Sequence, residues 1–499
     1  MCMIKTASQY HAQTSYDRHK MGGHDLDWQN RPVVFKEYPG IDPVQLPVDT
    51  PAVEGKLSSI LKEPKADTLS RSLGIGDLSL ILRLTHTLTA KAAYSGEEFF
   101  YRSAASAGAL YPTEIYVATL GIDGLDNGLY HFGIHRHALT PLRMDDLSEY
   151  IAGLIIPSPE KAPVITFFFT AIFFRSAWKY RDRSYRYHLL DTGHVMENMT
   201  IAARVLRLPV HLSYDFDDRS VNPLLGVNET KEACLAMAHV PGDRSMSGSK
   251  RTEIQRLSDN IRNASIVSKK EIEYPAIKEI HRECEEVVLN RDYGHEMIDH
   301  LGLPPDRSRE SLGPSSLPGE TDYPDCLFAR RSSRNFIREP LDKEQILALL
   351  SSLCVHDGCN CLSLGFFANN IKGITPGLYM VDTRQKVFSL VAAGSFMDNM
   401  ARACLDQAWL RNASIHFLFL SNLDLLERSR GPRGYRYAML EAGRLGERIY
   451  LVSTSLGLGC CGIGAFYDNE TAKWIGLNRD SRLLYLVAVG KLKALLTRE

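Results

Sequence analysis

The sequence lacks a long apolar run. Its longest, residues 164–174, is far shorter than the roughly 20 residues that a membrane-spanning helix needs, and its aromatic and β-branched content is typical of a strand buried on both faces. The N-terminus also lacks the apolar core of a secretory signal. We therefore expect a cytoplasmic protein whose ten cysteines are reduced.

The sequence also lacks an excess of either charge. Its formal net charge is −1 and its isoelectric point is near 7.0. The chain as a whole therefore has no positive electrostatic field that would attract nucleic acid or an anionic bilayer. We expect neither a nucleic acid nor a membrane as a partner. What the chain does have is length: 499 residues with 44% hydrophobic content exceed the roughly 250 to 300 residues at which single cores stop growing. Two domains are indicated.

An internal repeat supports two domains of one fold. Residues 179–187 return as residues 429–437, at a shift of 250 residues, and three further landmarks keep nearly the same offset. These pairs are 128–130 with 377–379, 164–169 with 414–419, and 189–208 with 439–458. The repeat predicts a first domain at residues 1–240, a charged connector at 241–325 and a second domain at 326–499.

The pattern of each copy predicts an α+β fold with a mainly antiparallel central sheet between helices. In the first copy we expect a helix at 78–88, strands at 114–120 and 164–174, and a long helix at 187–208. In the connector, residues 271–288 have near-helical apolar spacing interrupted by Pro275, which suggests a helix across both domains.

A basic run opens the second copy: Arg330, Arg331, Ser332, Ser333 and Arg334 stand just before a predicted helix that begins near residues 341–344. Guanidinium groups are rigid multi-donor forks that keep their charge, so the run suits a phosphate. The alternative is a solvated basic turn.

Four glycines lie in residues 455–466, after the long helix of the second copy. They permit a tight turn out of the helix and let backbone N–H groups approach a planar ligand. The alternative is a helix C-cap followed by a buried strand. At the 250-residue shift the first copy keeps none of these glycines, and alignment of the helices that follow the arginine run places residues 64–70, which contain no arginine, opposite residues 330–336.

The first copy has instead a small-residue loop, residues 102–112, in a spacer longer than that of the second copy. Small side chains and hydroxyls there form a shelf against which a flat ring can lie. A cluster of Cys354, His356, Cys359 and Cys361 lacks a second ligand pair with zinc-finger spacing, so we predict no metal site.

Several of these motifs together resemble the nitroreductase superfamily of flavin enzymes, and within it the SagB-type (thiazole/oxazole-forming) dehydrogenases. They are Ser-Ala-Gly-Ala-Leu-Tyr-Pro at 106–112, the stretch 178–194, Arg-Arg-Ser-Ser-Arg at 330–334 and the glycine run from 456. Residues 10–39 also resemble the opening of SagB-type chains. The similarity covers nearly all of both copies and excludes the connector.

The resemblance implies FMN, held in this family at the interface of a dimer. Here it implies an intramolecular pseudo-dimer of two nitroreductase-like domains with one FMN. The second copy would supply Arg330, Arg331, Ser332, Arg334, Gly462, Ile463 and Gly464, and the first Ser106, Ala107, Gly108 and Ala109. The other interface site, whose motifs are lost, would be empty or filled by side chains. Whether the pseudo-dimer is a monomer or associates further stays open.

The resemblance also implies catalytic roles for Lys179 and Tyr180, whose counterparts in the second copy are Ser429 and Arg430. A lysine acts as a base only if burial or a nearby cation lowers its pKa. The function implied first is an oxidoreductase that oxidises azolines in a modified peptide by hydride transfer to flavin N5. Two alternatives stay open: an NAD(P)H-dependent nitro or quinone reductase acting on a small molecule, and a degenerate flavin-holding subunit of a partner complex.

Overall fold

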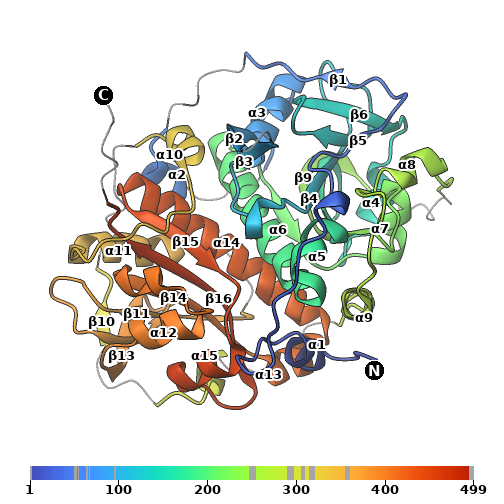
Figure 1. Cartoon of the computed structure of the whole chain (residues 1–499). Coiled ribbons are helices and arrows are strands. Elements are labelled where there is room, and N and C mark those ends of the chain that lie inside the picture. The colour runs from blue at the N-terminus through green and yellow to red at the C-terminus, as the bar shows by residue number, and fades with distance from the viewer. Residues whose placement is uncertain are drawn as a thin grey trace. The chain divides into compact units, whose positions relative to one another are not determined.

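The computed structural model describes most of the chain (Figure 1). The described residues are 3–49, 53, 55–62, 66, 68–94, 97–246, 254–288, 297–304, 309–313, 321–354 and 360–493. They form two compact units. Unit 1 comprises Met1–His24, Gly55–Lys62 and Val288–Glu499, and unit 2 comprises Asp25–Glu54 and Glu63–Val287.

Unit 2 is built on a 7-stranded antiparallel sheet of order β1-β6-β5-β4-β7-β9-β8. Its strands are β1 (Val44–Gln45), β4 (Thr113–Thr119), β5 (Gly128–Gly133), β6 (Ala138–Arg143), β7 (Lys161–Ile172), β8 (His211–Ser213) and β9 (Glu232–Ser245). The longer spacer of the first copy forms a separate hairpin, β2 (Leu88–Tyr94) with β3 (Glu97–Arg102). This hairpin leads directly into the small-residue loop.

The long helix of the first copy, α6, contacts helices α3 and α5 and strands β4 and β7. The α-helices are α3 (Ile75–Thr85), α4 (Ser148–Ala152), α5 (Phe173–Tyr180), α6 (Ser184–Val205), α7 (Asp218–Leu225), α8 (Asp259–Asn263) and α9 (Pro275–Glu283), with short 3₁₀ turns η1 (Trp28–Asn30), η2 (Ala107–Ala109) and η3 (Arg181–Arg183). A core that includes Phe168, Met237 and Leu225 is fully buried. A separate cluster with Leu110, Phe174 and Trp178, against which Tyr180 packs, holds α5, the helix that carries the predicted catalytic residues.

Unit 1 repeats the sheet of unit 2 strand for strand. Its order is β10-β13-β12-β11-β14-β16-β15, again 7-stranded and antiparallel, drawn from yellow to red in Figure 1. The strands are β10 (Arg309–Ser311), β11 (Ser363–Ala368), β12 (Gly377–Asp382), β13 (Val387–Ala393), β14 (Ile415–Asn422), β15 (Gly459–Ile463) and β16 (Ser481–Gly490).

The long helix α14 occupies in unit 1 the place that α6 has in unit 2, and it contacts α11, α13, β15 and β16. The helices are α1 (Ala7–Gln13), α2 (Leu57–Lys62), α10 (Tyr323–Ala329), α11 (Lys343–Leu353), α12 (Met397–Ala403), α13 (Leu423–Arg430), α14 (Arg433–Ser455) and α15 (Asp468–Ile475), with 3₁₀ turns η4 (Met297–His300) and η5 (Ala408–Asn412). Asp342 caps α11 in a capping box with Gln345, which explains why that helix begins where the sequence predicts.

The N-terminal segment belongs to unit 1. Thr6 caps α1 by accepting a hydrogen bond from the Gln9 backbone N–H. His11 lies with its Nε2 at 3.2 Å from Asp468 Oδ1 and its Nδ1 at 3.1 Å from Tyr435 Oη. These buried contacts join the start of the chain to α14 and α15.

The predicted fold class is confirmed: both copies are α+β, with an antiparallel sheet flanked by helices. The helix and strand positions expected in the first copy agree with α3, β4, β7 and α6 to within a few residues. No helix among the described residues is long and apolar enough to cross a membrane.

The helix expected within residues 271–288 is present as α9, but the interruption expected at Pro275 and the reduced state expected for all ten cysteines are wrong. Pro275 does not interrupt a helix but begins one, α9, because the first turn needs no N–H donor from it. Cys361 is disulfide-bonded, so not all ten cysteines are reduced. His356 and Cys359 of the cysteine cluster lie outside the described residues.

Candidate functional site

The small-residue loop of unit 2 is held by Asp191, a carboxylate on α6. Ser106 Oγ donates to Asp191 Oδ2 at 2.6 Å, and the Ala107 N–H lies 3.1 Å from Asp191 Oδ1. The Tyr111 N–H donates in turn to Ser106 Oγ at 2.9 Å. The Ser106 hydroxyl and the Ala107 N–H are thus engaged inside the unit, and Gly108 and Ala109 form the exposed part of the shelf.

Gly108 brings this loop against the predicted catalytic pair. A Cβ added at Gly108 would lie 2.7 Å from Tyr180 Oη and 3.4 Å from Lys179 Nζ. Its φ of +65° is also one that side chains rarely adopt. Only glycine fits this position. The structure therefore gathers residues 106–109, Lys179, Tyr180 and Asp191 in one place, which we call the unit 2 cluster.

Asp191 is the residue of this cluster that sequence reasoning missed. Burial raises the pKa of its carboxyl to about 7, against the hydrogen bonds from Ser106 and Ala107, which lower it. Its counterpart Glu441 on α14 is instead paired with Arg444 at 2.7 Å. The only signal in the sequence was this correspondence of two acids in the repeat, which does not reveal their different partners.

A buried ionic network forms hydrogen bonds with the end of the small-residue loop. Arg175 Nη1 donates to Glu114 Oε1 and, at 3.1 Å, to the Tyr111 carbonyl. Burial would raise the pKa of Glu114, but the guanidinium of Arg175 and the ring of His131 hold it below its usual range. The Arg102 N–H donates to Tyr111 Oη at 3.2 Å. These hydrogen bonds thus hold both ends of the small-residue loop, Arg102 and Tyr111, in place.

In unit 1 the basic run lies beside the glycine strand β15. The Ser333 N–H donates to the Cys460 carbonyl at 2.8 Å. Tyr450 of α14 joins the two segments, because its hydroxyl lies 2.9 Å from Ser332 Oγ and accepts from the Gly462 N–H at 2.7 Å. We call residues 330–334, Tyr450 and residues 462–464 the unit 1 cluster.

The three arginines of the run differ in their surroundings. Arg330 is buried, with its Cζ 5.3 Å from the centre of the Tyr450 ring. Arg331 donates to the Phe328 carbonyl at 2.9 Å. Arg334 is exposed, with its Cζ 5.9 Å from the centre of the Trp409 ring, and no described residue forms an ion pair with it. Arg334 therefore keeps donors for a ligand.

The glycines after α14 serve several packing needs. Gly457, at φ +67°, follows the helix end. A Cβ at Gly459 would lie 2.2 Å from Leu492 Cδ2, and one at Gly462 would lie 1.8 Å from Tyr485 Oη. Ile463 is buried, and Gly464 follows the strand. The alternative of a helix cap followed by a buried strand thus accounts for part of this run.

The two cysteines of β15 are not nucleophiles in this environment. Burial raises the pKa of both the Cys460 and the Cys461 thiols, although a hydrogen bond with Arg334 partly offsets this for Cys461. Thiols held protonated in this way are poor nucleophiles.

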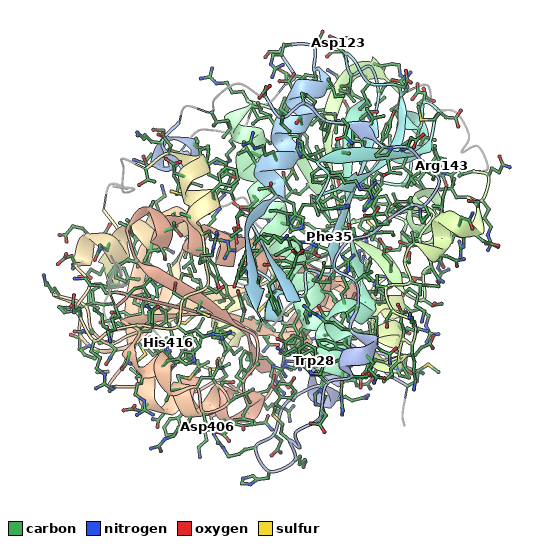
Figure 2. All side chains as sticks on the ribbon, turned by 45° about the horizontal axis from the view of Figure 1, so that its top comes forward. Trp28, Phe35, Asp123, Arg143, Asp406 and His416 are labelled. Atoms are coloured by element: carbon green, nitrogen blue, oxygen red, sulfur yellow. The ribbon has the colours of Figure 1, made fainter. Side chains whose placement is uncertain are left out.

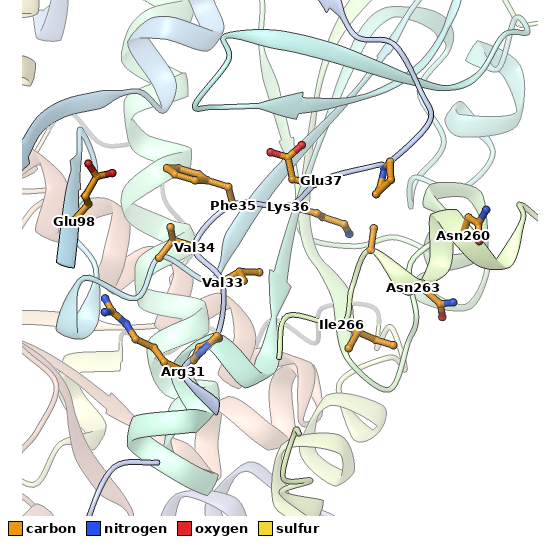
Figure 3. Close-up of a pocket in the computed structure, with 13 residues that line it drawn as sticks. Arg31, Val33, Val34, Phe35, Lys36, Glu37, Glu98, Asn260, Asn263 and Ile266 are labelled. Carbon is orange, nitrogen blue, oxygen red and sulfur yellow. The ribbon is translucent and has the colours of Figure 1, made fainter. Parts of the chain in front are cut away.

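Unit 2 also contains a pocket of about 960 Å³, which we call the Val33 pocket (Figure 3). Its walls come from the segment Arg31–Pro39, from Glu98 of β3 and from residues 260–266 in and after α8. Figure 2 places Trp28 and Phe35 along this N-terminal part of unit 2. Phe35 packs on Phe100 of the hairpin with ring centres 5.0 Å apart.

Comparison with known families identifies the family of both copies. The Nitroreductase family matches residues 76–242 and 327–491, one stretch in each copy and more than half of the chain. The chain belongs to the Nitroreductase family. The superfamily-level resemblance seen in the sequence is therefore confirmed.

Individual relatives cover different shares of this nitroreductase-family chain. A Methanocaldococcus jannaschii protein named as nitroreductase MJ1384 is 28% identical over 177 residues, 33% of this chain and 89% of that protein. The trifolitoxin-processing protein TfxB of Rhizobium leguminosarum bv. trifolii is 28% identical over 149 residues, 29% of this chain and 40% of that protein.

The likeness to a solved structure extends over nearly the whole chain. A protein named as a nitroreductase from Anabaena variabilis superposes with a TM-score of 0.77 at 24% identity, covering 98% of this chain and 100% of that one. At this identity the likeness establishes the tandem fold.

Proposed function

We propose that the chain is an FMN-dependent oxidoreductase in which the unit 1 and unit 2 clusters together hold one flavin per chain. The observation that carries the proposal is the division of parts between the copies. Unit 1 has an exposed arginine without an ion-pair partner among the described residues, beside glycine-containing β15, while unit 2 has the shelf loop against Lys179 and Tyr180.

The donor set of the unit 1 cluster fits the phosphate of FMN. Arg334 presents a fork of N–H donors from the surface, and the hydroxyl of Ser332 lies on the same segment. The run is attached to β15 by the Ser333 to Cys460 hydrogen bond, so a phosphate held there would lie close to the backbone of residues 462–464. Arg330 and Arg331 add positive charge behind it.

The unit 2 cluster fits the ring side of the cofactor. Gly108 and Ala109 expose small surfaces on which an isoalloxazine can lie, and Asp191 with Tyr111 fixes the loop in place. FMN bound there supplies a two-electron hydride acceptor at N5. Lys179 and Tyr180, in contact range of Gly108, are the groups that take or give the accompanying proton at the substrate.

For the reaction, we propose oxidation of a thiazoline or oxazoline in a modified peptide. The hydride leaves one ring carbon of the substrate, and Lys179 or Tyr180 removes the proton from its neighbour, which leaves an aromatic azole. The similarity to TfxB, whose name refers to toxin processing, supports a peptide substrate. The similarity to MJ1384 over 89% of that protein supports the second candidate, an NAD(P)H-dependent nitro or quinone reductase.

Flavin content tests the cofactor. The purified protein should be yellow with one FMN per chain, and Arg334→Ala should weaken FMN binding by roughly 10-fold or more because a charge-assisted hydrogen bond to phosphate is lost. Arg338→Ala is the matched control, because Arg338 is also exposed but donates to Asn412 at 3.0 Å. Equal loss of FMN in both variants, or a colourless wild type that cannot be reconstituted, would exclude the proposed site.

Anaerobic bleaching then separates the two reactions. A flavin that is reduced by a heterocyclised peptide and ignores NAD(P)H supports the dehydrogenase, and the reverse supports the reductase. Lys179→Ala should retain FMN and lose turnover, whereas Lys161→Ala, an exposed lysine of the same unit, should retain both. Unchanged turnover in Lys179→Ala would remove the proton role.

A further inference from the structure

We propose that the Val33 pocket binds an extended, uncharged and mainly apolar peptide segment, the stretch that flanks the reacting residue of the substrate. This inference rests on the proposed peptide substrate and adds a second binding surface, away from the flavin-binding residues.

Three of the four charged residues of the pocket lining form ion pairs within unit 2, and the fourth, Arg31, has its Cζ 5.8 Å from the centre of the Trp28 ring and 5.1 Å from that of the Phe99 ring. Lys36 is buried against Glu232. Glu37 is paired with Arg136 at 2.9 Å, and Glu98 with Lys91. A ligand rich in charge, such as a dinucleotide with its phosphates, therefore meets one arginine here, Arg31, and not the three arginines of the unit 1 cluster.

The remaining lining is apolar surface with two side-chain amides. Val33 is 56% exposed and Ile266 46% exposed, so both present apolar side-chain surface in the pocket lining. Asn260 and Asn263 are exposed one helical turn apart on α8, and no described residue forms a hydrogen bond with either side-chain amide. Each amide offers a donor and an acceptor, as a peptide group requires.

The pocket is preformed, because hydrogen bonds hold the segment Arg31–Pro39 that forms one of its walls. The carbonyl of Val33 accepts from Arg175 Nε at 3.1 Å, and that of Val34 from Arg102 at 2.7 Å. The Val33 N–H donates to the Val267 carbonyl at 2.8 Å. Both arginines are fully buried, so the wall formed by this segment is fixed before a ligand arrives.

The pocket is continuous in the chain with the catalytic pair. Trp28, three residues before Arg31, packs on Trp178 with ring centres 5.2 Å apart, and Trp178 directly precedes Lys179. The Trp178 indole Nε1–H also donates to the Asp27 carbonyl at 2.8 Å. A volume of about 960 Å³ suits a ligand of several residues rather than a single ring.

The test uses the full-length flavoprotein and two fluorescein-labelled probes followed by fluorescence anisotropy. The first is an uncharged hexapeptide of alternating Val, Leu and Ser, and the second has two of its apolar residues replaced by Glu. We expect saturable binding of the first probe and at least tenfold weaker binding of the second, because carboxylates would be desolvated against apolar walls.

Val33→Asp should weaken binding of the uncharged peptide at least tenfold, because it places a carboxylate in the apolar wall. Val48→Asp is the matched control, a valine of the same unit that is 63% exposed and does not line the pocket, and it should bind within twofold of wild type. Asn263→Ala, which alters one amide only, should weaken binding about threefold.

Three outcomes would overturn the inference: no saturable binding by wild type, equal binding by Val33→Asp and wild type, or displacement of the peptide by NADPH. FMN per chain is measured in every sample. Loss of flavin in the wild type would count against the proposed cofactor instead, and normal flavin with no peptide binding would count against the pocket alone.

Discussion

Asp191→Asn should make the stability of unit 2 less sensitive to pH. Burial raises the pKa of the Asp191 carboxyl from 3.8 to about 7. An unfolded chain therefore loses this proton at lower pH than the folded chain does, and between these two values the folded state binds more protons. The free energy of unfolding must then fall as the pH rises from about 4 to about 7, and stay low above that.

The size of the effect follows from the two pKa values. One pKa unit corresponds to 1.36 kcal/mol, so a shift of about 3 units gives at most about 4 kcal/mol, of which roughly 2 to 3 kcal/mol is lost between pH 5 and pH 8. Asparagine cannot ionise, and its side-chain amide can still accept a hydrogen bond from the Ala107 N–H and form one with the Ser106 hydroxyl. The variant should therefore exceed wild type in stability by more at pH 8 than at pH 5.

Urea unfolding measured by tryptophan fluorescence can follow unit 2 by itself. Replacing Trp409 and Trp474 of unit 1 by Phe leaves Trp28 and Trp178 as reporters. Asp77→Asn is the control. The hydrogen-bonded guanidinium of Arg71 lowers the Asp77 pKa, so this substitution should change the pH dependence of the free energy of unfolding in the opposite direction. Parallel stability curves for wild type and Asp191→Asn from pH 5 to pH 8 would refute the reasoning.

Three further variants test the packing of the clusters. Gly108→Ala should reduce turnover more than tenfold by displacing Tyr180, whereas Gly121→Ala, at nearly the same φ but with no atom within 4 Å of its Cβ, should show only the backbone cost of about 1 kcal/mol in urea unfolding. Gly462→Ala should destabilise unit 1 by about 1 to 3 kcal/mol and weaken FMN binding, since its Cβ would meet Tyr485; unchanged stability and affinity would contradict the assigned contact. Lys36→Met should cost about 3 to 5 kcal/mol by leaving Glu232 buried without its cation, and adding Glu232→Gln should recover part of the loss.

The sequence by itself determined the fold class and the repeat. Apolar periodicity and the 250-residue offset depend on local chain chemistry, and the same strand order recurs in both units as they predict. Pro275 shows a limit of reasoning from local sequence. A proline can end a helix or lie in its first turn, and the backbone around it decides between the two.

Part of the candidate site was also readable in the sequence. The arginine run and the glycine strand were recognised as separate motifs, and so were the small-residue loop and Lys179 with Tyr180. Sequence could not show that Tyr450 links the first two through hydrogen bonds, or that Gly108 faces Tyr180. Such contacts join residues that are distant along the chain, and no local pattern encodes them.

The tertiary structure alone decided the role of Asp191 and the existence of the Val33 pocket. An aspartate on a long helix has no special pKa until burial removes its water, and only the folded loop brings Ser106 and Ala107 to it. The pocket likewise needs three segments far apart in the sequence to meet. Local sequence fixes which elements form, whereas burial and long-range contact set the chemistry of the side chains that they carry.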